Sequence, residues 1–138
     1  MRTIIGYGND LRGEDAFGVD VLKNLELENL ENTQLLTLFQ LTPEILLDLL
    51  ESDEIVFVDA CYSPDYPYAL ACNLEEQNQN TLSHHISYTM IVKMLNSLYN
   101  KYPKYEVFSM LSLEFDEVKD EKKYRQVVKN VSTYLSIA

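Results

Sequence analysis

Residues 6–18 read GYGNDLRGEDAFG, a glycine-rich stretch with the form of a ligand-binding loop. The preceding residues 2–5 are a short run with two β-branched isoleucines, and the apolar residues of the segment 17–25 are spaced largely as one face of a helix. The stretch is therefore predicted to join a strand to a helix, and such junctions hold ligands in α/β proteins.

The charges of this loop favour a cation over a phosphate. A dinucleotide fingerprint needs a third glycine where this chain has Leu11. Gly8 and Gly13 have P-loop spacing, but Glu14 and Asp15 follow them, and two carboxylates would repel an anion. An acidic side chain presented by a tight glycine turn suits a hard or borderline cation. The alternative is that both acidic residues only complement the dipole of the helix.

The bulk composition indicates one folded domain, spanning residues 1–138. The chain is 46% hydrophobic and 24% charged, as in globular proteins, and its net charge of −11 argues against nucleic acid or an anionic membrane as a partner. No apolar run approaches a membrane span and the N-terminus lacks the pattern of a signal peptide, so we expect a cytoplasmic protein, and a monomer. Cys61 and Cys72 are too few and too far apart for a zinc knuckle or a redox pair, and we expect two thiols.

Segments that read as strands alternate with segments that read as helices. Strands are predicted at 34–39, 54–60 and 105–111, and a further strand is possible at 68–74. Helices are predicted at 43–50 with Thr42 as N-cap, from Ser83 onward, and at about 118–135. Residues 55–58 are apolar on both faces, as in an interior strand of a parallel sheet. The predicted fold class is α/β, a three-layer sandwich with a mostly parallel twisted sheet between helices.

Three polar side chains are predicted to meet at the carboxyl edge of this sheet, where open parallel sheets bind ligands. Asp15 follows the first strand, Asp59 ends the apolar run 55–58, and His84 stands at the start of a predicted helix. Two carboxylates and an imidazole from separate loops form a plausible metal site with open coordination positions. Taken singly, each residue has a more ordinary explanation, as a helix cap or a hydrogen-bonded histidine.

With these motifs the chain resembles the hydrogenase maturation endopeptidases, which trim the C-terminal extension from large-subunit precursors of nickel-iron hydrogenases. Residues 6–19 resemble the family's opening motif, Gly-x-Gly-Asn-x-Leu-x-x-Asp-Asp/Glu-x-x-Gly-Val. Residues 56–60 resemble the family's apolar strand that ends in Asp-Ala. Residues 83–88 resemble the family's Ser/Thr-His-x-x-Ser/Gly-Leu motif. The resemblance implies that Asp15, Asp59 and His84 contact the metal.

The adjacent His85 is a rival ligand to His84. The apolar positions of the following segment fall in the family's register only when His84 is the ligand, so we choose His84; these positions are Tyr88, Ile91, Val92 and Leu95.

The resemblance implies an endopeptidase whose substrate is a hydrogenase large-subunit precursor already loaded with nickel, with cadmium or zinc as expected substitutes for nickel in vitro. A divalent ion can polarise the scissile carbonyl, and we hypothesise that Asp15 acts as general base while Asp59 and His84 anchor the metal. Both aspartates are thus expected to be catalytic. The resemblance further places substrate-binding groups at Gly8 and Asn9.

One motif departs from the family pattern. Many members carry an Asp-Gly-Gly-Thr turn after the second strand, whereas this chain has FQLTPE at residues 39–44, where Gln40 and Glu44 are expected to line the cleft. The departure leaves open a non-catalytic paralogue that docks a metalloprotein precursor. Two further alternatives are a cysteine protease that uses Cys61 with His84, and a nucleotide-binding domain that uses the glycine loop.

Overall fold

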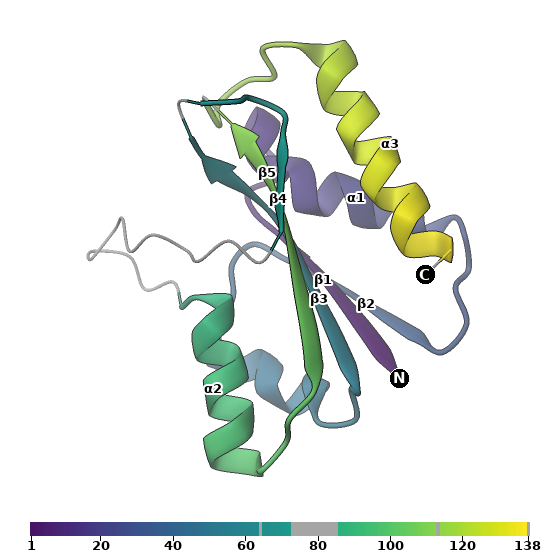
Figure 1. Cartoon of the computed structure of the whole chain (residues 1–138), viewed down its shortest axis with the longest axis vertical. Helices are drawn as coiled ribbons and strands as arrows, with labels where there is room; N and C mark the ends of the chain where they lie inside the picture. Colours follow the sequence, from purple (N-terminus) through teal and green to yellow (C-terminus); the bar gives the residue numbers. More distant parts are fainter. Residues whose placement is uncertain (64, 73–85, 113, 138) are drawn as a thin grey trace.

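The computed structural model describes residues 1–63, 65–72, 86–112 and 114–137. In these ranges the chain forms a five-stranded sheet in the order β2-β1-β3-β5-β4 (Figure 1). The strands are β1 (Arg2–Tyr7), β2 (Thr33–Leu38), β3 (Glu54–Tyr62), β4 (Leu70–Cys72) and β5 (Lys104–Ser112). All neighbouring pairs are parallel except β4 with β5, which is antiparallel. The predicted α/β sandwich with a mostly parallel sheet is therefore confirmed.

Helices cover both faces of the sheet (Figure 1). The helices α1 (Phe17–Glu26) and α3 (Glu121–Ile137) pack on one face, and α2 (Tyr88–Tyr99) packs on the other together with the 3₁₀ helix η2 (Pro43–Leu49). A second 3₁₀ helix, η1 (Gly13–Ala16), leads directly into α1. Among the described helices, none is long and apolar enough to cross a membrane.

The alternation of side chains along the central strands explains the two layers. Ile4 of β1 belongs to the cluster beneath α1 and α3, whereas its neighbour Ile5 belongs to the cluster beneath α2 and η2. In β3, Val56 and Val58 face the first cluster while Ile55 and Phe57 face the second. Full burial of each such side chain contributes about 1.5–3 kcal/mol, which is why a run apolar on both faces selects the interior of the sheet.

The prediction that a helix begins at Ser83 is wrong. Helix α2 begins at Tyr88, and its N-cap is Ser87, whose hydroxyl accepts a hydrogen bond from the backbone N–H of Met90 (3.2 Å). Ser87 satisfies a backbone donor that the helix itself leaves unpaired, and it has the extended backbone of an N-cap residue. Ser83 lies outside the described residues.

The helix predicted at 43–50 is a 3₁₀ helix, and Thr42 does not cap it with its side chain. Thr42 has the extended conformation of an N-cap, and Pro43 stands in the first turn as predicted. The hydroxyl of Thr42 bonds the side chain of Glu44 instead, which lowers the pKa of that exposed carboxyl. The possible strand at 68–74 is confirmed in part, as β4 at Leu70–Cys72; residues 73 and 74 lie outside the described residues.

Candidate functional site

The first turn of α1 lies against the backbone of the sheet because residue 18 has no side chain. A Cβ on Gly18 would lie 2.2 Å from the carbonyl oxygen of Val58 and 2.8 Å from the backbone nitrogen of Tyr7. Only glycine allows this approach. The start of α1 is thereby fixed beside the end of β1 and the middle of β3, so this glycine serves helix–sheet packing.

Asp15 lies in η1, the turn that this packing places at the carboxyl end of β1. Its side chain is half-buried, and Oδ2 accepts a hydrogen bond from the backbone N–H of Asn9 (3.1 Å). The backbone of the turn is close to the preceding loop as well, since a Cβ on Gly8 would lie 2.1 Å from the carbonyl oxygen of Asp15. The loop 8–12 and the turn 13–16 therefore hold the Asp15 carboxylate in a defined orientation.

Asp59 stands one residue beyond Val58, which with Gly6 forms the last pair between β3 and β1. The residue is only 9% exposed, and its Oδ1 accepts a hydrogen bond from the hydroxyl of Ser109, its partner on β5 (2.6 Å). The strand does not stop at the carboxylate as predicted, because β3 continues along β5 to Tyr62. Asp59 shares a face of β3 with Phe57, which packs in the cluster beneath α2.

Asp15 thus lies in the turn after β1, and Asp59 lies on the neighbouring parallel strand β3, one residue beyond its last pair with β1. His84 and its rival His85 lie outside the described residues, so their place in the site stays a prediction. Within ranges 1–63, 65–72, 86–112 and 114–137, no three histidine, cysteine, aspartate or glutamate side chains come together as a metal site. The two aspartates are oxygen donors of the kind that hard and borderline cations accept.

The predicted substrate-binding residues lie in the two loops beside β1 and β2. The backbone N–H of Gly8 donates to the carbonyl of Leu38 (3.1 Å), and the side-chain oxygen of Asn9 accepts from the backbone N–H of Leu11 (2.9 Å). Both groups therefore shape the loop. Gln40 is half-buried directly after β2, and Glu44 is exposed in η2. Contact of any of them with a substrate stays a prediction.

Cys61 is half-buried on β3, and its thiol lies 3.8 Å from the carbonyl oxygen of Tyr62. Alternation along the strand puts it on the same face as Asp59. The cysteine-protease alternative needs His84 as well, which lies outside the described residues.

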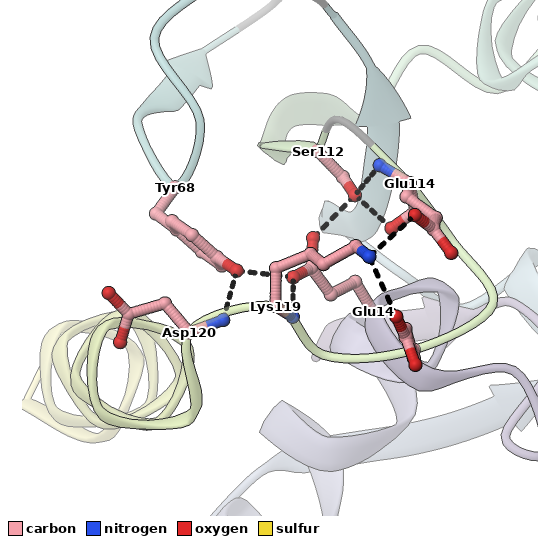
Figure 2. A network of polar contacts seen from close by, with 7 residues as sticks. Glu14, Tyr68, Ser112, Glu114, Lys119 and Asp120 are labelled. Atoms are coloured by element: carbon pink, nitrogen blue, oxygen red, sulfur yellow. Dashed lines mark hydrogen bonds and ion pairs between the residues drawn. The ribbon is translucent and has the colours of Figure 1, made fainter.

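The role of Glu14 could not be predicted from the sequence. The residue is 1% exposed, and its carboxylate belongs to a network of polar contacts (Figure 2). Its carboxylate accepts hydrogen bonds from the hydroxyl of Tyr68 (2.5 Å), the hydroxyl of Ser112 (2.5 Å) and the backbone N–H of Lys119 (3.0 Å). Burial and the bond to Glu14 raise the pKa of Tyr68 to about 12, so the tyrosine is a donor at neutral pH. No local pattern marks Glu14, because its donors lie 54 to 105 residues away in the chain.

The fold and its two aspartates define the class: an α/β sandwich with a mostly parallel sheet, with one carboxylate in the turn after β1 and another on β3 just beyond its last pair with β1. No protein-family model and no curated protein matches the sequence. Among solved structures, the NiFe hydrogenase maturation protease HycI from Thermococcus kodakarensis KOD1 is similar with a TM-score of 0.76 and 20% identity, over 99% of this chain and 90% of that one.

Two further similar structures are also those of hydrogenase maturation peptidases. The hydrogenase maturating endopeptidase HybD from E. coli has a TM-score of 0.77 and 16% identity, over 97% of this chain and 88% of that one. The hydrogenase 2 maturation peptidase from Thaumarchaeota archaeon SCGC_AB-539-E09 has a TM-score of 0.63 and 19% identity, over 99% of both chains. The chain has the fold of the hydrogenase maturation proteases over nearly its whole length, as the resemblance predicts.

Proposed function

We propose that this protein is an endopeptidase that removes the C-terminal extension of a nickel-loaded hydrogenase large-subunit precursor. One observation carries the proposal: a chain with the fold of hydrogenase maturation proteases has Asp15 in the turn after β1 and Asp59 on the adjoining strand β3, just beyond its last pair with β1. The proposed substrate brings its own metal, which both carboxylates and His84 contact. The part played by His84 rests on the sequence resemblance alone.

The two aspartates differ in their surroundings, and this difference supports different roles. Asp59 is 9% exposed and held by the Ser109 hydroxyl, which suits a fixed contact to a metal. Asp15 is half-buried in a turn, which suits a general base that must reach water or the scissile bond. The nickel of the bound precursor supplies Lewis acidity toward the scissile carbonyl.

Cleavage of the precursor is the direct test. A nickel-loaded large-subunit precursor that keeps its C-terminal extension is incubated with the protein, and the released peptide is measured by mass spectrometry. We expect cleavage by the wild type and a loss of at least about 100-fold in Asp59→Asn and His84→Ala. Asp10→Asn, the same chemical change as Asp59→Asn at an exposed position of the loop that precedes Asp15, is the matched control and should cleave normally.

Each other outcome has a defined meaning. Retained cleavage by Asp15→Asn would remove Asp15 from the role of general base. Binding of the precursor without cleavage would favour the docking paralogue, which the absent Asp-Gly-Gly-Thr turn at residues 39–44 supports. Calorimetric titration of the same variants with nickel and with cadmium tests whether the side chains bind metal without the precursor.

A further inference from the structure

The buried carboxylate of Glu14, in η1, accepts hydrogen bonds from two other segments of the chain (Figure 2). Tyr68 comes from the segment between β3 and β4, whereas Ser112 and Lys119 come from the end of β5 and from the segment that leads to α3. The hydroxyl of Tyr68 also accepts a hydrogen bond from the backbone N–H of Asp120 (2.7 Å), so the two segments are bonded to each other through the same group.

Two further contacts press the β5–α3 segment against η1. A Cβ on Gly13, which has a positive φ of 41°, would lie 2.5 Å from the Cα of Glu117. The guanidinium of Arg12 pairs with the carboxylate of Asp116 (2.8 Å) at the surface. An exposed pair of this kind contributes little by itself. The buried Glu14 is therefore the principal connection between η1 and the segments around it.

Glu14 and Asp15 are neighbours in a turn of only four residues, and their side chains are bonded by different parts of the chain. Glu14 is bonded by the segments around Tyr68 and Lys119, whereas Asp15 is bonded by the N–H of Asn9 in the loop after β1. A rotation of the turn that releases one side chain must move the other, because no flexible residue separates them.

We propose that Glu14 is a positioning residue for the peptidase reaction, one that fixes the orientation of Asp15 by bonding η1 to the β3–β4 and β5–α3 segments. The inference rests on the proposed function for its kinetic consequence. Its structural consequence, a defined Asp15–Asn9 hydrogen bond that depends on Glu14, is measurable without any substrate.

The test compares Glu14→Ala with Glu14→Gln. The glutamine oxygen can accept from Tyr68 and Lys119, and its NH₂ can donate to Ser112, whose own hydroxyl then donates to the carbonyl of Glu114 (2.7 Å). We therefore expect Glu14→Gln to retain kcat within about threefold, since nearly every bond is kept. We expect Glu14→Ala to lose about 10- to 100-fold in kcat with KM within about twofold, as for misplacement of a catalytic group.

Amide hydrogen exchange at Asn9, followed by NMR, reads the position of Asp15 directly. We expect exchange at this amide to be about tenfold faster in Glu14→Ala and near the wild-type rate in Glu14→Gln. This readout decides the inference even if the wild type cleaves no precursor, so failure of the proposed function and failure of the inference are distinguishable.

Two tyrosine variants provide a matched control, and they keep the inference testable if Glu14→Ala does not fold. Tyr68→Phe removes the hydroxyl that bonds Glu14, and Tyr124→Phe removes a hydroxyl that bonds a different carboxylate, Asp20, between α3 and α1 (2.6 Å). We expect only Tyr68→Phe to accelerate exchange at Asn9 and to lower kcat. Equal effects of the two variants, or unchanged Asn9 exchange in Glu14→Ala, would overturn the inference.

Discussion

Gly18→Ala tests whether the close approach of α1 to the sheet is a requirement of this fold. The added Cβ would lie 2.2 Å from the carbonyl oxygen of Val58, and ordinary van der Waals contact starts at 3.4 Å. The first turn of α1 would have to withdraw by roughly 1 Å, a gap that forfeits a quarter to a half of the dispersion attraction between the atoms it separates. The obstacle is backbone of a central strand, so it cannot move aside as a flexible side chain would.

Two opposing effects set the expected size of the loss. Overpacking of a tight site costs about 1–3 kcal/mol, whereas exchange of glycine for alanine within a helix gains at most about 1 kcal/mol. We expect the free energy of unfolding to fall by about 1–2 kcal/mol, because a clash with backbone lies at the upper end of the overpacking range. Urea denaturation followed by circular dichroism measures this change as a lower midpoint with an unchanged slope.

A second substitution in the same helix isolates the steric effect. Asn24→Ala adds no atoms, changes an exposed position of α1 and should raise the free energy of unfolding by a few tenths of a kcal/mol through helix propensity alone. If Gly18→Ala were as stable as the wild type, the reasoning from close backbone approach would be refuted. The glycine would then need another explanation.

Two further predictions concern the start of α2 and the alkaline limit of stability. Ser87→Ala should lower the free energy of unfolding by about 1 kcal/mol, because it removes the hydrogen bond from the Met90 N–H. Urea denaturation measures this change, and an unchanged midpoint would argue against Ser87 as the N-cap. The pKa of Tyr68 is raised from 10.0 to about 12, so its contribution to stability is intact below pH 10 and is lost as the pH rises through about 12. Melting temperatures measured from pH 9 to 12 should therefore fall less steeply for Tyr68→Phe than for the wild type, and equal slopes would contradict this reasoning.

The fold could be predicted because its strongest signals are local. The run 55–58 is apolar on both faces, and this pattern alone places it inside a parallel sheet. The position of Asp15 after β1 follows from the same alternation of strands and helices. Asp59 lies one residue beyond the last pair of β3 with β1, but β3 extends past it to Tyr62 because it stays paired with β5 there.

The start of α2 and the role of Glu14 could not be predicted, for two physical reasons. Ser83 and Ser87 are both acceptable N-cap residues, and the choice between them depends on where the following residues pack. The burial of Glu14 depends on donors at Tyr68, Ser112 and Lys119, which only the folded chain brings together. Sequence spacing gives no measure of such long-range contacts.

The layer formed by α1 and α3 has a consequence for the order of events during synthesis. Its core joins residues from near the two ends of the chain, since the α3 side chains of Tyr124, Val128, Val131 and Leu135 pack with those of Phe17 and Leu22 from α1. Until α3 has left the ribosome, the part of the sheet that α3 covers and the apolar surface of α1 that packs on α3 are exposed. Nascent chains that stop before residue 121 should therefore expose this apolar surface, and the 17 residues of α3 take about 1–3 s to synthesise at roughly 5–20 residues per second.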